Sequence, residues 1–217
     1  MTKPTSDQLK YLEQLVLESF KNDASGHDFF HTQRVVVMAK RLSHEENANE
    51  IICELAAWLH DIPDHKLVAS EELGWERVRS ILSKAGLIEY YDVIKQVISE
   101  VSYKGAGVET RCSSIESSIV QDADRLDAIG AIGIARTFAY GGSKGRTMYD
   151  PNVKVELHND FNTYKSSTAP TINHFYEKLL LLKDRLNTSS AKTIAINRHV
   201  FMEQFLDQFY HEVKGER

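Results

Sequence analysis

The sequence predicts an all-α protein that folds as a single helical bundle. Apolar residues recur three and four positions apart along most of the chain, which is the spacing of a helix with one buried face. The 217 residues include only 4 prolines and 11 glycines, so few positions force the chain out of a helix. Hydrophobic residues make up 42% of the chain, enough for a sizeable core. Because we find no internal repeat, low-complexity tract or shift in composition, we expect one domain over residues 1–217.

Three helices are predicted in the first part of the chain. The first is expected at Thr5–Lys21, where Thr5 or Ser6 can cap its start. The second is expected at Asp28–Leu42 and the third at Asn47–His60. Pro63 argues against a longer third helix, because proline lacks the backbone N–H that a helix interior needs.

The rest of the chain is also mostly helical by its pattern, apart from one irregular segment at about 143–170. That segment is polar and without a sustained period, which favours a functional loop, and Val153–Leu157 within it is a candidate short strand or hairpin. The sequence predicts either two helices or one bent helix over Ser113–Arg125 and Asp127–Tyr140, ended by Gly141 and Gly142. The expected helices are Glu71–Ala85, Ile88–Val101, Ser113–Arg125, Asp127–Tyr140, Thr171–Leu186 and Thr188–Val213.

Composition narrows the class of function. The net charge of −5 and a pI near 6.0 give no general attraction to a polyanion, which argues against polymeric nucleic acid as a partner. The 2 cysteines, Cys53 and Cys112, lack metal-ligand spacing and are interpreted as reduced thiols. The sequence contains no run of about 18 apolar residues, so it does not predict a membrane span. We therefore expect a soluble cytoplasmic protein that does not bind a membrane.

Histidines and aspartates occur where the predicted helices begin or end. His27 and His31 are four positions apart and Arg34 follows three later, so the three share one helix face. His60 and Asp61 close the third helix, where two adjacent side chains can flank a bound ion. These positions are candidates for chemistry rather than for the core.

Three further carboxylates, Asp122, Asp124 and Asp127, lie in the otherwise apolar stretch VQDADRLDAIGAIGIAR. Burying several carboxylates is costly unless cations or a metal compensate their charge. A set of two His and two Asp ligands suits octahedral Mn²⁺, Fe²⁺, Ni²⁺ or Mg²⁺, and the absence of cysteine argues against a structural zinc site. For Asp124, pairing with a neighbouring Arg or Lys is the favoured interpretation.

The ordered pattern His31, His60-Asp61, Asp122 resembles the metal-binding signature of the HD-domain phosphohydrolase superfamily. The blocks HDFFHTQRVVVMAKRL, LAAWLHDIPDHK, VQDADRLDAIGAIGIAR and GGSKGR are similar to a compact bacterial subgroup of single-domain HD hydrolases. The resemblance extends from His27 through the late stretch TINHFYEKLLLLKDRL. It implies the HD-domain, phosphodiesterase-like helical bundle.

The resemblance also implies one divalent metal ion, held by His31, His60, Asp61 and Asp122. Mn²⁺ or Mg²⁺ is favoured, and Ni²⁺, Co²⁺ and Fe²⁺ are alternatives. HD enzymes with two metals use extra histidines between the His-Asp pair and the last Asp, whereas Lys66–Gln121 contains none. A mononuclear site is therefore expected, which argues against oxygenase and cyclic-dinucleotide phosphodiesterase chemistry.

The remaining site residues are predicted from the same resemblance and from the needs of phosphoryl transfer, in which cations position and neutralise phosphates. Asp64 is expected to orient or deprotonate the attacking water, and Lys66 to assist beside the metal ligands. His174 is interpreted either as a helix-cap residue or as one that faces the pocket. The predicted substrate contacts are His27, Arg34, Arg125, Asp127, Arg146 and Lys165.

These residues predict a metal-dependent phosphohydrolase acting on nucleotides. The favoured reaction is hydrolysis of nucleoside or deoxynucleoside triphosphates to monophosphate and pyrophosphate. The alternatives are a 5′-nucleotidase or a guanosine tetraphosphate hydrolase using the same site, and a nucleotide-binding HD sensor module without catalysis. A small-molecule nucleotide is the expected partner, and the sequence leaves a homodimer open.

Overall fold

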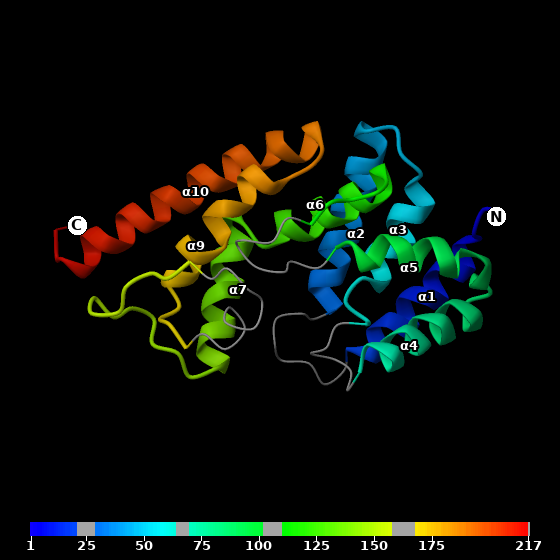
Figure 1. The fold of residues 1–217 in the computed structure, drawn as a ribbon, viewed down its shortest axis with the longest axis horizontal. Coiled ribbons are helices and arrows are strands. Elements are labelled where there is room, and N and C mark those ends of the chain that lie inside the picture. The colour runs from blue at the N-terminus through cyan, green and yellow to red at the C-terminus, as the bar shows by residue number, and fades with distance from the viewer. Residues whose placement is uncertain (21–28, 64–69, 102–109, 158–167, 217) are drawn as a thin grey trace. The chain divides into compact units, whose positions relative to one another are not determined.

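The structure is a computed structural model that describes residues 1–20, 29–63, 70–101, 110–157 and 168–216 (Figure 1). These residues form α- and 3₁₀-helices joined by turns, with no strand among them, so the predicted all-α fold class is confirmed. They divide into two compact units, residues 1–101 with 110–123 and residues 124–216. None of the described helices is long and apolar enough to cross a membrane.

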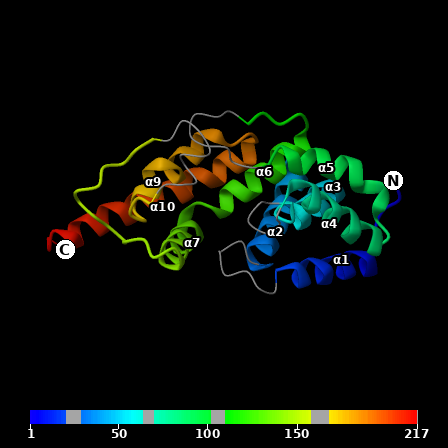
Figure 2. The same cartoon turned by 60° about the horizontal axis from the view of Figure 1, so that its bottom comes forward.

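The first unit is built around α3 (Glu50–Leu59), a short apolar helix that is buried along most of its length. It packs against α2 (Phe29–Glu45), which lies beside it in both views, and against α5 (Tyr91–Ser99) (Figure 1; Figure 2). The helix α1 (Ser6–Ser19) packs against α4 (Glu71–Lys84). A 3₁₀ turn, η1 (Ile88–Tyr90), precedes α5. The core between these helices is mainly aliphatic, and its fully buried members include Leu12, Val35, Leu55, Leu59, Val78 and Ile94.

Side-chain caps fix where the first helices begin. Thr5 accepts a hydrogen bond from the backbone N–H of Gln8, whose side chain accepts one from the N–H of Thr5, which together form a capping box. Asn49 accepts hydrogen bonds from the N–H groups of Ile51 and Ile52 and so starts α3 at Glu50, three residues later than the sequence predicted.

The second unit contains α7 (Gly130–Ser143), α9 (Asn173–Glu177), the 3₁₀ helix η2 (Leu179–Arg185) and α10 (Ser189–Val213). The long helix α10 packs against α7 and η2, and both views show η2 alongside it (Figure 1; Figure 2). Its core is aromatic: the rings of Phe175 and Phe205 stack with centroids 5.6 Å apart, and Phe138 lies 5.9 Å from Phe205.

The helix α6 (Ile115–Asp127) runs through the boundary, which falls between Ala123 and Asp124. Ala128 and Ile129 separate α6 from α7, and Gly130, whose φ of +75° favours glycine, is the first residue of α7. The stretch that the sequence left as a pair or one bent helix is therefore two helices.

Two expectations about the later chain were wrong. The segment Val153–Leu157 is not a strand or hairpin, and its side chains at 153, 155 and 157 are exposed. A strand needs a neighbouring backbone to satisfy its N–H and C=O groups, and no strand in the described residues supplies one. The expected helix Thr171–Leu186 is interrupted at Lys178, whose φ of −142° and ψ of −59° are not helical, so that only α9 and η2 form there.

Candidate metal centre

The end of α3 delivers His60 and Asp61 to the candidate site. The chain keeps helical dihedral angles at His60, where φ is −59° and ψ is −35°, so the pair follows directly from the rigid helix. Both side chains are buried, with 6% and 8% of their residue surface exposed. Two carboxylate or imidazole groups this deep need hydrogen bonds or a cation to offset the lost hydration.

The turn after Asp61 is held in place by close packing against α4. A Cβ atom at Gly74 would lie only 2.6 Å from the Cα of Pro63, so a side chain there would collide with the backbone of the turn. Glycine at position 74 therefore allows α4 to approach the segment that carries the His-Asp pair. This contact positions the turn that follows the pair.

A hydrogen bond determines which nitrogen of His60 faces the site. The Nδ1 atom lies 2.8 Å from the carbonyl oxygen of Ala57, and because a carbonyl only accepts, Nδ1 carries the proton. In the neutral ring the Nε2 atom then has a lone pair available to a metal. This Nε2 atom lies 3.4 Å from Oδ1 of Asp61.

His31 completes a compact pair of imidazoles. It belongs to the first turn of α2 and is fully buried. Its Nε2 atom lies 3.4 Å from Oδ2 of Asp61, and its ring centroid lies 5.4 Å from that of His60. The carboxylate of Asp61 thus presents one oxygen to each imidazole. Nitrogen lone pairs and carboxylate oxygens repel each other unless a proton or a metal ion lies between them.

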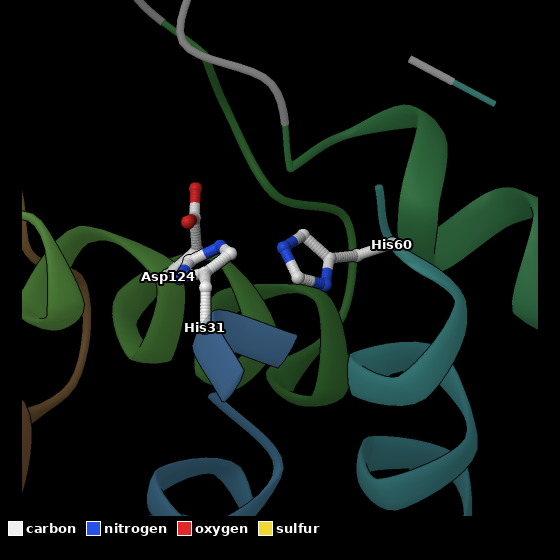
Figure 3. A group of neighbouring side chains, drawn as sticks. All are labelled: His31, His60 and Asp124. Atoms are coloured by element: carbon white, nitrogen blue, oxygen red, sulfur yellow. The ribbon is translucent and has the colours of Figure 1, made fainter. Parts of the chain in front are cut away.

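Asp124 supplies a further carboxylate from α6. Each of His31, His60 and Asp124 offers a ligand atom, and these three atoms lie within 4.8 Å of one another (Figure 3). Asp124 is the first residue beyond the unit boundary, but α6 is one continuous helix, so its position follows from the same helix as Ala123. The three residues come from α2, the end of α3 and α6.

Asp122, which the sequence favoured as the fourth ligand, is not a member of this group among the described residues. Two positions along a helix turn a side chain by about 200°, so Asp122 and Asp124 point to nearly opposite sides of α6. Asp122 is fully buried, whereas Asp124 keeps part of its surface exposed. The interpretation of Asp124 as a partner of a neighbouring basic residue therefore missed its position beside the two histidines.

The donor set fits a divalent metal ion. Two imidazoles and carboxylate oxygens converge from three helices, and this mixture of nitrogen and oxygen donors suits Mn²⁺, Fe²⁺, Co²⁺ or Ni²⁺. No cysteine takes part, because Cys53 is buried in α3 and Cys112 is not in the group. His31, His60, Asp61 and Asp124 are the residues that would hold the ion.

Arginines anchor the last turn of α6, which follows Asp124. Arg198 of α10 donates to the backbone carbonyl of Leu126 at 2.5 Å, and Arg125 donates to the carbonyl of Arg185. Asp127 is paired with Arg136 of α7 at 2.7 Å. The contact from Arg198 gives the carbonyl of Leu126, at the end of α6, a second donor beside the N–H of Ile129. In this structure Arg125 and Asp127 therefore have structural contacts, and their predicted contacts with substrate remain predictions.

The other predicted site residues are spread over the chain. Arg34 lies on α2, one turn after His31, and is half-buried. Arg146 lies after α7, with its guanidinium carbon 5.7 Å from the ring centroid of Tyr140. Four predicted residues lie outside the described residues: His27, Asp64, Lys66 and Lys165.

Comparison with known proteins identifies the family of this chain. The HD domain family model matches residues 28–129, which include His31, His60, Asp61 and Asp124. The uncharacterized protein YpgQ of Bacillus subtilis (strain 168) is 37% identical over 213 residues, covering 96% of each chain. Its crystal structure in complex with ADP has a TM-score of 0.76 at 34% identity and covers 96% of this chain and 100% of YpgQ.

Two other solved structures are similar over nearly the whole chain. A protein from Lactobacillus plantarum has a TM-score of 0.85 at 36% identity, covering 98% of this chain and 100% of that one. An HD-superfamily hydrolase from Bacillus thuringiensis has a TM-score of 0.74 at 43% identity, covering 95% and 97% of the two chains. With its buried His and Asp donors and these relatives, the chain belongs to the HD-domain family and has the fold of the HD-superfamily hydrolases.

Proposed function

We propose that this protein is a metal-dependent phosphohydrolase that converts nucleoside or deoxynucleoside triphosphates to monophosphates and pyrophosphate. The observation that carries the proposal is the convergence of His31, His60 and Asp124 around the carboxylate-bearing end of α3. A divalent cation there supplies a water molecule of lowered pKa and positive charge beside the phosphorus atom.

The chain's own residues orient the donors and exclude water. The hydrogen bond from His60 to Ala57 holds the imidazole in the tautomer that presents Nε2, and this fixed geometry lowers the cost of organising the site. Burial of His31 and His60 strengthens each electrostatic contact, because little solvent remains to screen it. Asp64 and Lys66 remain the predicted residues for orienting the water and contacting phosphate.

A nucleotide is the substrate class that the relatives favour. YpgQ was crystallised in complex with ADP, and the similarity between the two chains extends over their full lengths. A triphosphate carries several negative charges, and phosphoryl transfer depends on cations that neutralise them. The predicted cations Arg34, Arg146, Lys66 and Lys165 suit such a substrate better than an uncharged ester.

The proposal is tested by incubating purified protein with ribo- and deoxyribonucleoside triphosphates and each of Mn²⁺, Mg²⁺, Co²⁺ and Ni²⁺. Products are separated by ion-exchange chromatography into nucleoside, monophosphate, diphosphate, phosphate and pyrophosphate. We expect equal amounts of monophosphate and pyrophosphate. Absence of turnover with every metal and nucleotide would overturn the proposal.

The bond that breaks is identified by running the reaction in H₂¹⁸O. Attack of water on the α-phosphorus breaks its bond to the bridging oxygen and places ¹⁸O in the monophosphate, whereas attack on the β-phosphorus places it in pyrophosphate. We expect the label in the monophosphate, measured by mass spectrometry. Label in pyrophosphate would preserve the phosphohydrolase but contradict the proposed point of attack.

Adding nucleoside monophosphates and guanosine tetraphosphate to the panel separates the alternatives. Release of phosphate from nucleoside monophosphates alone would identify a 5′-nucleotidase, and release of pyrophosphate from guanosine tetraphosphate alone would identify a hydrolase of that nucleotide. Nucleotide binding in calorimetry without any turnover would identify a sensor module. The paired imidazoles and carboxylates argue against the sensor, because binding of a nucleotide does not by itself require them.

A further inference from the structure

Two basic segments of the second unit lie against each other, although they are about 30 residues apart in the sequence. The first is the stretch that follows α7 and contains Lys144 and Arg146. The second is α9 with the residue after it, and it contains His174 and Lys178.

Backbone hydrogen bonds hold the two segments together. The N–H of Thr171 donates to the carbonyl of Thr147 at 2.9 Å, and the N–H of Ile172 donates to the carbonyl of Met148 at 3.1 Å. A Cβ atom at Gly141 would lie 2.1 Å from Oγ1 of Thr171, so glycine is needed for this approach. The start of α9 is therefore fixed beside the residues that follow Arg146.

Positive side chains gather at this junction. The Nζ atom of Lys144 and the guanidinium carbon of Arg146 lie 5.6 and 5.7 Å from the ring centroid of the same residue, Tyr140. On α9 the N–H of Lys178 donates to the carbonyl of His174 at 3.0 Å, which places these two side chains one turn apart on one face. The three cations are accompanied by one carboxylate of α9, the buried Glu177.

Charges from both segments act on the imidazole of His174. Burial, together with the charges of Lys178 and Arg146, lowers its pKa to about 3, although part of the residue surface stays exposed. The two charges that act on it come one from each segment. His174 is consequently neutral at physiological pH, where its ring has one N–H donor and one acceptor nitrogen.

We propose that Arg146, His174 and Lys178 form a binding subsite for the polyphosphate of the nucleotide. The identity of the ligand rests on the proposed function, and Lys178 and His174 are new contacts that the sequence did not assign. Arg146 provides a planar fork that pairs with two phosphate oxygens, and Lys178 provides a point charge. The neutral His174 donates one hydrogen bond without adding a third charge.

The chemistry of this cluster favours a chain of phosphates over a single phosphate ester. Cations held on two adjacent segments can neutralise the charges of neighbouring phosphoryl groups. A monophosphate offers charge at one point only and would engage one cation fully. The subsite therefore predicts a preference for triphosphates over monophosphates.

The test is isothermal calorimetry of the full chain with inorganic tripolyphosphate, in the presence of a chelator so that neither metal nor hydrolysis takes part. We expect binding that weakens about tenfold in Lys178→Gln and in Arg146→Gln, the size of one lost charge-assisted hydrogen bond. Lys178→Arg should retain most of the affinity. Lys192→Gln on the exposed side of α10 in the same unit is the matched control and should bind as the unchanged protein does.

Circular dichroism of each variant establishes whether it is folded. If Lys178→Gln does not fold, the conservative variant Lys178→Arg and Arg146→Gln still test the subsite. Equal affinity of Lys178→Gln, Arg146→Gln and the control would overturn the subsite, as would no binding of tripolyphosphate by the unchanged protein. Binding that depends on Arg146 and Lys178 without any nucleotide turnover would support the subsite and overturn the proposed reaction. If turnover occurs, the variants should raise KM for triphosphates more than they lower kcat.

Discussion

The two units of this chain differ in the side chains that form their cores. The first has an aliphatic core, and its helices α1, α3 and α4 start with the side-chain caps Thr5, Asn49 and Ser70. The second has an aromatic core around Phe175 and Phe205, and among its described helices α10 starts with the cap Thr188, whereas α7 and α9 start without a side-chain cap.

This difference corresponds to the chemistry that each unit carries. His31 lies in the first turn of α2, and His60 and Asp61 follow the end of α3, so regular helices allow little variation in their positions. The cations of the second unit follow helix ends and turns, where long side chains can reach a ligand of variable shape. A metal site needs fixed donor positions, whereas a phosphate subsite needs charge within reach.

The largest effect expected from a single substitution concerns the acidic ligand on α6. Asp124→Asn should weaken Mn²⁺ binding by about 100-fold or more, because it removes a ligand rather than a residue that orients one, for which losses of about 10–100-fold are typical. Asp122→Asn is the matched control two positions away and should bind Mn²⁺ within about tenfold of the unchanged protein. The measurement is electron paramagnetic resonance of free Mn²⁺ during titration.

If Asp122→Asn loses the metal and Asp124→Asn keeps it, then the sequence-based choice of Asp122 is correct and the group seen at Asp124 is not the metal site. Equal losses would indicate that both carboxylates belong to it.

Glycines in the two units should respond oppositely to alanine. At Gly74 the added Cβ would lie 2.6 Å from the Cα of Pro63, and overpacking of this kind costs about 1–3 kcal/mol of unfolding free energy. At Gly142 in α7 nothing lies within 4 Å of an added Cβ, so Gly142→Ala should be neutral or stabilise by up to about 1 kcal/mol through helix propensity. Urea unfolding of both variants measures the difference.

The Mn²⁺ affinity of the two variants provides a second measurement of the same difference. Because Gly74 supports the turn after Asp61, Mn²⁺ binding should weaken in Gly74→Ala and remain unchanged in Gly142→Ala. An unchanged stability and affinity in Gly74→Ala would show that the turn relaxes without cost.

Arg198 of α10, which contacts the last turn of α6, should contribute more to stability than exposed residues of α10 do. Arg198→Met removes a hydrogen bond from a charged donor to the carbonyl of Leu126, which keeps the one from the N–H of Ile129, and such a bond contributes about 1.5–3 kcal/mol. Lys192→Met on the exposed face of α10 is the control and should change the unfolding free energy by less than about 0.5 kcal/mol. Equal values for the two variants would refute the anchoring role of Arg198.

The smallest effect is expected at the cap of α3. Asn49→Ala should lower the unfolding free energy by about 1 kcal/mol, since two N–H groups lose their acceptor. Asn49→Asp keeps an acceptor and should restore most of the stability, as measured by thermal unfolding. A loss in Asn49→Asp equal to that in Asn49→Ala would contradict the capping explanation.

Much of the helical structure follows from local signals that the sequence contains. Thr5 and Thr188 are N-caps close to the predicted starts, and α4 begins at the predicted Glu71, because capping depends on a few adjacent residues. The expected helix Thr171–Leu186 was wrong because the apolar spacing on which it rested does not reveal that the backbone leaves helical angles at Lys178. The candidate strand Val153–Leu157 failed because pairing is a non-local property.

The sequence by itself determined the helical class and the order of the blocks, because residue type and spacing carry that information, and its resemblance to HD hydrolases implied the pairing of His31 with the His60-Asp61 dipeptide. Only the tertiary structure decided which carboxylate of α6 lies with the histidines, since Asp122 and Asp124 differ by a rotation about the helix axis. It also brought His174 and Lys178 beside Arg146, through backbone hydrogen bonds between segments about 30 residues apart. Contacts of that kind depend on how the chain folds back on itself, and no local pattern specifies them.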